Sequence, residues 1–266
     1  MTKTVFAYYN EKGGVGKTSS VLNMLYFFNC MKLFKRAVAI DMDPQRSLTL
    51  LSGCQPKHTV LDVLADEVDI NDAIVSTPYG DIIPTNRELK TVDAQMDVNA
   101  AETDSQRKEY ESNLLTLRKK LKGLKNYDYV ILDCPPGYAN IAMSCLVAAD
   151  ILIIPAKASK AALYALSSIS PIIEVARRYN KGLKIAGVLL TYHNDRTNAA
   201  RYGAEASIAL AEANLNTKVF KNVIRYSTAV EDAYFEGVPL LRRNTPVAED
   251  YRRFFEEMLK GEGLWQ

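Results

Sequence analysis

The sequence predicts an α/β fold, with a doubly wound, mainly parallel sheet and helices on both faces. Two observations lead to this prediction. Short apolar runs rich in β-branched and aromatic residues recur along the chain, and such runs suit strands that are buried on both faces. Segments long enough to form helices separate these runs, and alternation of strand and helix is typical of a parallel sheet with right-handed crossovers.

The expected elements follow from these runs in chain order. The apolar runs predict strands at Val5–Tyr9, Ala37–Ile40, Asp81–Ile83, Tyr129–Leu132, Ile151–Ile154 and Ile185–Leu190. The segments between them predict helices at Thr18–Cys30, Arg107–Leu124, Ala139–Ala149, Ala161–Tyr179 and Tyr202–Asn214. Neither a Pro/Gly/Ser-rich linker nor an internal repeat interrupts the alternation, so we expect a single domain over residues 1–266.

Composition and charge exclude several classes of protein. The chain has 266 residues, 48% of them hydrophobic and 24% charged, which is ordinary for a globular protein and excludes disordered and collagen-like chains. Its 33 Lys and Arg residues against 31 Asp and Glu give a formal net charge of +2. That balance excludes a protein that coats DNA through a surface that is basic all over.

The cysteines and the N-terminal segment predict a cytoplasmic protein. Cys30, Cys54, Cys134 and Cys145 form no C-x-x-C pair, so the sequence offers neither a zinc ribbon nor a disulfide framework. Sparse, unpaired cysteines suit a reducing compartment. The N-terminus leads directly into a strand-like run without a signal-peptide core, and no apolar stretch reaches the ~18 residues of a membrane span.

The first expected strand runs into a glycine-rich loop, E-K-G-G-V-G-K-T at residues 11–18, and then into a helix. This strand–loop–helix arrangement predicts a P-loop, in which backbone N–H groups and the helix N-terminus bind phosphates. Lys17 is expected to reach the β- and γ-phosphates, and the Thr18 hydroxyl to bind Mg²⁺. Glu11 occupies the first glycine position of the strict pattern. A plain tight turn is the alternative, but the Gly-Lys-Thr ending favours the P-loop. The predicted ATP-binding residues are Glu11, Lys12, Gly13, Gly14, Val15, Gly16, Lys17, Thr18 and Ser19.

Carboxylates follow two further strands. Asp41 and Asp43 come at the end of the second strand, where open parallel sheets bind ligands. The alternative to a ligand site is that these aspartates only cap the next helix, which applies more to Asp41 than to Asp43. Asp133 ends the apolar strand that begins at Tyr129, which is the Walker B pattern of a carboxylate that holds Mg²⁺. Pro-Pro-Gly at residues 135–137 then predicts a turn that can follow the γ-phosphate.

Residues 12–18, K-G-G-V-G-K-T, resemble the deviant Walker A motif of the ParA/MinD family of P-loop NTPases. In that family an extra lysine, here Lys12, reaches across a dimer interface to the nucleotide held by the other subunit. The resemblance therefore implies a homodimer that forms when ATP is bound. The segment D-M-D-P-Q at residues 41–45 is similar to the family's D-x-D-P-Q, which implies that Asp43 positions the attacking water and Asp41 supports the Mg²⁺ shell.

The resemblance covers nearly the whole chain and favours the ParA and Soj partition ATPases over MinD. D-I-I-P-T-N at residues 81–86, G-V-L-L-T-Y at 187–192 and F-K-N-V-I-R at 220–225 are similar to further family segments. A partition ATPase of this type implies a weak ATP hydrolase with Lys12, Lys17 and Asp43 as catalytic residues. It also implies non-specific binding to double-stranded DNA in the ATP state, stimulation by a ParB-type centromere-binding protein, and association with the nucleoid.

Basic residues cluster in three parts of the chain. Arg107–Lys125 and Lys157–Lys184 each carry an excess of cations, whereas acidic residues offset the cations near the C-terminus. A solvated helix face explains each cluster equally well. The resemblance points instead to DNA contacts at Lys221, Arg225, Arg252 and Arg253.

Three alternative functions share the same loop. A MinD-like positioning ATPase needs a basic amphipathic helix to bind membranes. The C-terminal apolar stripe Tyr251–Leu259 is flanked by four acids and three bases, so we expect it to pack on the core and expect no membrane binding. A metal-cluster carrier needs paired ligand cysteines, a spacing that Cys134 and Cys145 lack. A small-molecule ligase needs a second substrate pocket, which no motif in the sequence indicates.

Overall fold

The computed structural model describes residues 3–31, 36–91, 103–137, 140–157, 160–194 and 198–265. Within these ranges the strands form a single sheet in the order β3-β4-β2-β5-β1-β6-β7. The strands are β1 (Thr4–Tyr8), β2 (Ala37–Asp41), β3 (Val75–Thr77), β4 (Gly80–Ile83), β5 (Tyr129–Asp133), β6 (Ile151–Lys157) and β7 (Lys184–Thr191). All neighbours pair in parallel except β3, which is antiparallel to β4. The predicted doubly wound, mainly parallel sheet is confirmed.

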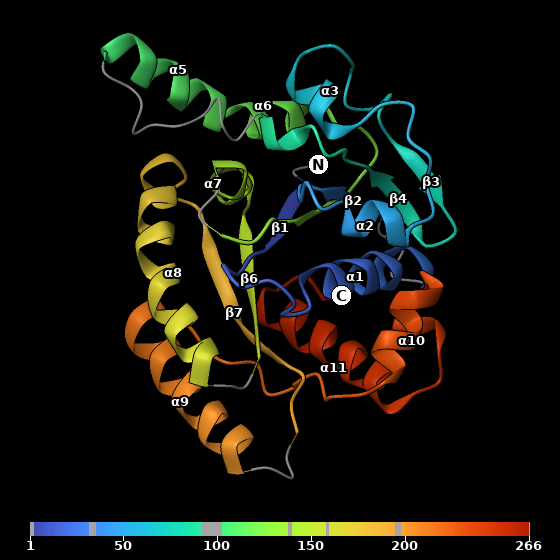
Figure 1. Ribbon diagram of the computed structural model, residues 1–266, viewed down its shortest axis with the longest axis vertical. Helices are drawn as coiled ribbons and strands as arrows, with labels where there is room; N and C mark the ends of the chain where they lie inside the picture. The colour runs from blue at the N-terminus through green and yellow to red at the C-terminus, as the bar shows by residue number, and fades with distance from the viewer. Residues whose placement is uncertain are drawn as a thin grey trace.

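Helices connect the strands and cover both faces of the sheet (Figure 1). They are α1 (Lys17–Cys30), α2 (Ser47–Leu51), α3 (Val60–Leu64), α5 (Asp104–Leu114), α6 (Thr116–Gly123), α7 (Asn140–Ala148), α8 (Lys160–Tyr179), α9 (Asn198–Leu215), α10 (Ala229–Glu236) and α11 (Pro246–Gly261), with a 3₁₀ turn, η2, at Leu240–Arg242. Each expected strand is present, and each expected helix except one is present as a single element. The expected helix Arg107–Leu124 is wrong as a single element, because the helix breaks at Leu115 and continues as α6.

The alternation of side chains along the central strand β1 divides the core into two layers. Phe6 and Tyr8 point to one face, where α1, α2, α10 and α11 pack, whereas Val5 and Ala7 point to the other, where α3, α6, α7, α8 and α9 pack. This is the period-two pattern of a strand that is buried on both sides. The aromatic stripe of α11 lies fully in the first layer, so the expectation that it packs on the core is confirmed.

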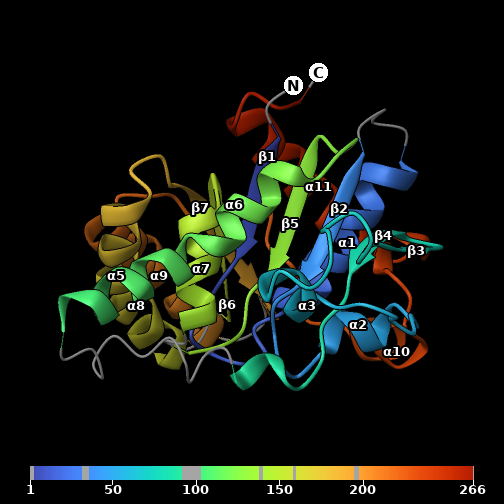
Figure 2. The same ribbon diagram turned by 90° about the horizontal axis from the view of Figure 1, so that it is seen from above.

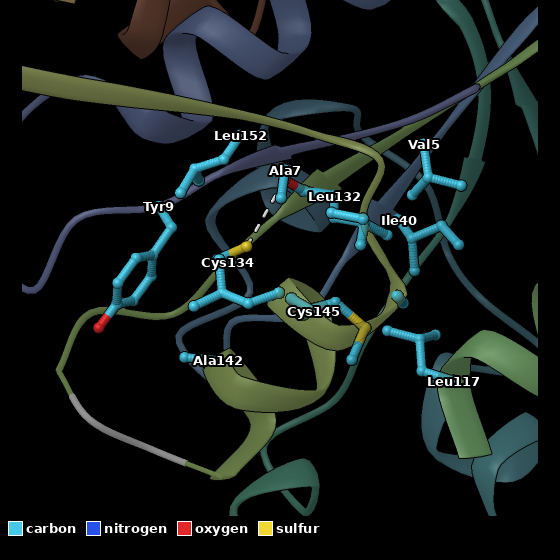
Figure 3. Packing of buried hydrophobic residues seen from close by; sticks show 14 of the residues in the cluster. Val5, Ala7, Tyr9, Ile40, Leu117, Leu132, Cys134, Ala142, Cys145 and Leu152 are labelled. Carbon is cyan, nitrogen blue, oxygen red and sulfur yellow. Dashed lines mark hydrogen bonds between the residues drawn. The ribbon is translucent and has the colours of Figure 1, made fainter. Parts of the chain in front are cut away.

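All four cysteines are free thiols, and two lie in the core layer under α7. Figure 3 shows Cys134, at the end of β5, and Cys145, on α7, among the apolar side chains of β1, β2 and α6. The thiol of Cys134 makes a weak contact to the carbonyl of Leu132 at 3.9 Å. Both cysteines therefore behave as small apolar residues in this packing.

Strand register brings three loops to the same edge of the sheet. Asp133 at the end of β5 is level with Tyr8 on β1 and with Asp41 on β2. The segments that follow β1, β2 and β5 therefore start side by side at the carboxyl edge of the sheet, where ligands bind in folds of this kind. The prediction of a single domain over residues 1–266 stays a prediction.

Candidate functional site

The loop between β1 and α1 has a backbone that glycine alone adopts easily. Gly14 has φ +68° and Gly16 has φ +87°, both in the left-handed region that disfavours side chains. Gly16 is the N-cap of α1 and offers no side-chain oxygen to the first turn, so the leading N–H groups of the helix stay available. Such a helix N-terminus attracts phosphate through its N–H groups and its dipole.

Lys17 is held inside this loop. Its side chain is largely buried, and its Nζ donates hydrogen bonds to the carbonyl oxygens of Asn10 and Lys12, both at 3.1 Å. Burial lowers the pKa of Lys17, and the charge of the nearby Asp133 acts against that change. The ammonium is therefore fixed at the centre of the loop, where a phosphate oxygen can replace the weaker carbonyl partners.

Asp133 is the least compensated charged group in the site. It is fully buried, and among the residues that the structure describes neither of its carboxylate oxygens has a hydrogen-bond partner of normal geometry. Burial raises the pKa of Asp133 well above its usual range and the neighbouring Asp41 adds to the shift, while the Thr18 hydroxyl and Lys17 lower it. A buried carboxylate beside a hydroxyl is costly on its own and fits a hard cation such as Mg²⁺, which prefers oxygen ligands.

Asp41 differs from Asp133 because its oxygens are occupied by protein donors. Oδ2 accepts hydrogen bonds from the Thr49 N–H at 2.8 Å and the Thr49 hydroxyl at 2.7 Å, and Oδ1 accepts one from the Asp43 N–H at 3.1 Å. Burial raises the pKa of Asp41 to about 6 despite these donors. Asp41 therefore fixes the start of α2 and the loop that carries Asp43, which suits a supporting role behind a metal rather than direct contact.

Asp43 lines the opening of the cleft into which the P-loop faces, which is described below. It is half-buried, and its Oδ1 accepts a hydrogen bond from the Gln45 N–H at 2.8 Å. Burial raises the pKa of Asp43, while the Gln45 N–H and Lys17 lower it. A partly exposed carboxylate near Lys17 can orient a water molecule beside a bound phosphate.

Glu11 connects the loop to two other elements. Its carboxylate accepts a hydrogen bond from the Ser168 hydroxyl on α8 at 2.7 Å, and its carbonyl accepts one from the Gly137 N–H at 2.9 Å. The Tyr9 hydroxyl also donates to the carbonyl of Gly137 at 2.9 Å. The turn after β5 is thus tied to the P-loop from both sides. The Lys12 side chain is exposed, as a residue that reaches another subunit must be.

The P-loop opens into a cleft of about 680 Å³. The sequence predicts one side of it, namely Gly13, Gly14, Gly16, Lys17, Thr18, Ser19 and Asp43. The opposite side comes from Tyr192 after β7 and from α10, which contributes Val230, Glu231, Asp232, Tyr234 and Phe235. The predicted binding residues Glu11, Lys12 and Val15 do not line the cleft with their side chains, and Val15 is buried in the core.

Sequence reasoning missed the second side of the cleft. Tyr192 has a left-handed backbone, φ +53°, and the Lys157 ammonium lies 4.1 Å from the centre of its ring. A strained aromatic residue at the carboxyl edge of the sheet marks a functional site. Its place directly after the β7 run is the signal that could have found it. The short helix α10 carries no comparable signal.

The four predicted DNA contacts lie on the segment before α10 and on α11, and Arg225 lines a small pocket together with Gly16 of the P-loop and Ser19 of α1. Arg225 forms a two-point ion pair with Asp250, at 2.6 and 2.7 Å. Arg252 and Arg253 both bond to Glu249. Lys221 is exposed, with its N–H bonded to Glu257 at 2.9 Å. Acidic residues of α11 therefore compensate much of this charge, and DNA contact through these residues stays a prediction.

Among the residues that the structure describes, no helix is long and apolar enough to cross a membrane.

Comparison with known proteins identifies relatives over most of the chain. A family model described as an AAA domain matches residues 3–185. The sporulation initiation inhibitor protein Soj of Bacillus subtilis is 31% identical over 89% of this chain and 90% of its own length. The chromosome partitioning protein ParA of Caulobacter vibrioides is 31% identical over 89% of this chain and 86% of its own length.

Solved structures share the fold. An ATP complex of Cyanothece McdA has a TM-score of 0.81 at 23% identity, covering 99% of this chain and 98% of the other. Cobyrinic acid a,c-diamide synthase from Mycobacterium smegmatis, with bound ADP and magnesium, has a TM-score of 0.78 at 25% identity, covering 98% and 96%. A family match over most of the chain, with partition proteins above 30% identity, establishes that this chain belongs to the ParA/Soj family of P-loop ATPases.

Proposed function

We propose that this protein is an ATP-driven dimerisation switch for DNA partition. It dimerises with ATP bound, binds duplex DNA non-specifically in that state, and hydrolyses ATP slowly until a ParB-type partner accelerates the reaction. The observation that carries the proposal is Asp133, at the end of the strand beside the P-loop, a fully buried carboxylate without a hydrogen-bond partner of normal geometry in the described part of the chain. Such a group is explained by a cation that accompanies a nucleotide.

Lys17 and the N–H groups of residues 13–18 bind the phosphates of ATP. The Lys17 ammonium already lies within the loop, so phosphate binding exchanges two carbonyl partners for anionic oxygens and needs little rearrangement. Thr18 and Asp133 hold Mg²⁺, and Asp41 supports them by fixing the neighbouring loop. When bound, the metal neutralises charge on the phosphate oxygens.

Asp43 orients the water that attacks the γ-phosphate. Its loop is held by Asp41, and Asp43 itself lines the cleft, so its carboxylate has a fixed position next to the phosphate site. Lys12 acts across the dimer on the nucleotide of the other subunit, which makes hydrolysis depend on dimerisation. Slow turnover then follows from the need to assemble two chains.

The second side of the cleft holds the nucleoside. Tyr192, Val230 and Tyr234 provide aromatic and aliphatic surface opposite the P-loop, and a flat base gains from such contacts. The Lys157 ammonium lies over the ring of Tyr192 and steadies it.

DNA partition is favoured over the other uses of this fold. The Soj and ParA relatives described above are each 31% identical and are named as sporulation and chromosome partitioning proteins, whereas the synthase is similar at 25%. The apolar stripe of α11 is buried, so it offers a membrane nothing to bind. The proposed location is the nucleoid in the cytoplasm.

The direct test is duplex DNA binding without nucleotide, with ADP and with a non-hydrolysable ATP analogue, each at two salt concentrations. We expect affinity at least tenfold higher with the ATP analogue than with ADP, and a strong salt dependence. Lys17→Ala, which removes the phosphate ligand, is the control and should abolish the nucleotide effect. Equal or absent DNA binding in all three states would reject the partition function.

A further inference from the structure

An ion pair ties one of the predicted DNA contacts, Arg225, to α11. The Arg225 guanidinium donates two hydrogen bonds to the Asp250 carboxylate, from Nε to Oδ2 at 2.6 Å and from Nη2 to Oδ1 at 2.7 Å. The Arg225 backbone N–H also donates to Oδ2, at 3.2 Å. Two parallel, charge-assisted hydrogen bonds make this a strong form of arginine–carboxylate pair.

The two partners of this pair differ in their exposure to solvent. The Asp250 side chain is 10% exposed, whereas the Arg225 side chain is 53% exposed. A carboxylate on the buried side of a helix needs a partner of opposite charge, so Asp250 holds the arginine as long as no other anion competes for it. The exposed part of Arg225 is the side from which such an anion can approach.

The backbone on both sides of the pair is held in place. The Tyr226 N–H donates to the His193 carbonyl at 2.8 Å, which fixes the segment that carries Arg225 beside the end of β7. On the other side, the buried Tyr251 hydroxyl of α11 lies 3.3 Å from the Ser20 hydroxyl of α1. These two helices pack against each other on one face of the sheet (Figure 2). Opening the pair therefore requires rotation of the Arg225 side chain and no movement of a whole element.

Other cations on α11 are compensated less completely than Arg225. Arg252 and Arg253 share the single carboxylate of Glu249, so this group of three side chains keeps one positive charge. All three side chains are partly exposed, and ion pairs in contact with solvent are weak. Arg225 and Asp250 instead form a neutral pair, so a phosphate beside them is attracted by one charge and repelled by the other.

We infer that the Arg225–Asp250 ion pair is an autoinhibitory contact, in which the carboxylate competes with DNA phosphates for the arginine. The inference rests on the proposed function and on the predicted DNA contact of Arg225. Because the carboxylate is present in every nucleotide state, the contact lowers the DNA affinity of each chain and helps a protein that has hydrolysed its ATP to leave the duplex. Arg225 lines a small pocket together with Gly16 and Ser19, so the pair lies near the cleft at which two chains meet in the proposed dimer.

Asp250→Asn tests this contact, because asparagine keeps an oxygen that can accept the Arg225 N–H but has no charge to hold the guanidinium. The matched control is Glu256→Gln, which removes one negative charge from the same helix at a residue that pairs with Lys260. Two further variants, Arg225→Gln and Arg225→Gln/Asp250→Asn, complete a double-mutant cycle. Thermal melting checks that each variant folds. Binding of a random-sequence duplex is then measured with ADP and with a non-hydrolysable ATP analogue.

We expect Asp250→Asn to raise DNA affinity by about threefold with ADP and by about tenfold with the ATP analogue, since the dimer loses two competing carboxylates. Glu256→Gln should change the affinity by less than about twofold. In the Arg225→Gln background, Asp250→Asn should have no more effect than this control. An equal gain in both Arg225 backgrounds would overturn the inference. A loss of affinity in Asp250→Asn would overturn it too, because the carboxylate would then position the arginine for DNA.

The same titrations separate the inference from the proposed function. If the unaltered protein binds duplex in the ATP state and Asp250→Asn leaves that affinity unchanged, the pair is not autoinhibitory while the proposed function stands. If neither protein binds duplex in any nucleotide state, the proposed function fails and the inference fails with it.

A second measurement needs no substitution at Asp250, in case Asp250→Asn does not fold. The Nε–H signal of Arg225 in a nuclear magnetic resonance spectrum is identified by its loss in Arg225→Lys. We expect this signal of the unaltered protein to shift when duplex is added in the presence of the ATP analogue, because the guanidinium exchanges the carboxylate for a phosphate. An unmoved signal in a sample that binds DNA would overturn the inference.

Discussion

Two aspartates at neighbouring strand ends show how local contacts decide the role of a side chain. Asp41 and Asp133 are both fully buried and level with each other on β2 and β5. Asp41 accepts three hydrogen bonds from Thr49 and Asp43, whereas Asp133 accepts none of normal geometry from the residues that the structure describes. The contacts of the first carboxylate hold the neighbouring loop, whereas the second has the unsatisfied charge that the proposed Mg²⁺ site requires.

Substituting each aspartate by asparagine should therefore change stability in opposite directions. Asp133→Asn removes a buried charge that Lys17 and the Thr18 hydroxyl compensate only in part, so we expect the melting temperature of the metal-free protein to rise by roughly 2–4 °C, equivalent to about 1 kcal/mol. Asp41→Asn removes hydrogen-bond acceptors from buried donors and should lower stability by about 1–3 kcal/mol. Asp133→Asn should also abolish the further stabilisation that Mg²⁺ and ATP give. A lower melting temperature for metal-free Asp133→Asn contradicts this account.

The burial of Asp41 and Asp133 also determines whether the stability of the fold rises or falls with pH. The pKa of each carboxyl is raised in the folded state, so the folded state holds more protons than the unfolded state at intermediate pH, and stability falls as pH rises. For Asp41 this window runs from its ordinary pKa to about 6. The stabilisation by Asp133→Asn should accordingly be larger at pH 8 than at pH 5, as measured by thermal melting. A larger stabilisation at pH 5 would contradict the predicted direction of this pH dependence.

Residue identities in the site were readable from the sequence, but their contacts were not. The loop motif located Lys17 and Thr18, and the strand-end aspartates located Asp43 and Asp133, because these residues follow recognisable apolar strands. The partner of Asp41, Thr49, lies on the five-residue helix α2, whose sequence shows no periodicity long enough to detect. The structure alone therefore shows that protein donors occupy both carboxylate oxygens of Asp41.

At the scale of elements, α10 determines the shape of the cleft. This eight-residue helix forms the side opposite the P-loop and places Phe235 in an almost fully exposed position, at 94%. It ends at Gly237, φ +64°, where an added Cβ would lie 2.7 Å from the carbonyl oxygen of Leu51 at the end of α2. The close approach of these two backbones fixes α10 beside the cleft.

Gly237→Ala should displace α10, and the chain offers a matched control. Gly53 has nearly the same backbone, φ +66°, but an added Cβ meets nothing within 4 Å. Gly53→Ala should cost about 1–2 kcal/mol from its left-handed conformation alone, without affecting ATP affinity. Gly237→Ala should cost more, because the clash adds to the strain, and should weaken ATP binding at least threefold. Denaturant unfolding and calorimetric titration measure both quantities; equal effects of the two variants would contradict this role of Gly237.

Long elements were predictable and short ones were not, for a physical reason. The buried parallel strands and the helices α1, α7 and α8 show continuous apolar runs or regular spacing over many residues. The elements α2, α3, β3 and α10 contain eight residues or fewer, and tertiary contacts stabilise them more than their own sequence does. The half of the cleft that sequence reasoning missed is built largely from such an element.

At the scale of the whole molecule, the cleft lies at the carboxyl edge of a sheet that is packed on both faces. A second chain that reaches ATP bound in this cleft has to approach the same edge. Dimerisation is therefore the step on which the proposed function depends.

The most direct test of the central claim is the solution mass of Asp43→Ala, which should bind ATP without hydrolysing it. Light scattering after size-exclusion chromatography should give the 29.7 kDa monomer with ADP and a particle of twice that mass with ATP. Lys12→Ala in the same background should stay monomeric with ATP, because the lysine that reaches across the interface is gone. A monomer with ATP, in a sample shown by filtration to have ATP bound, would contradict the account.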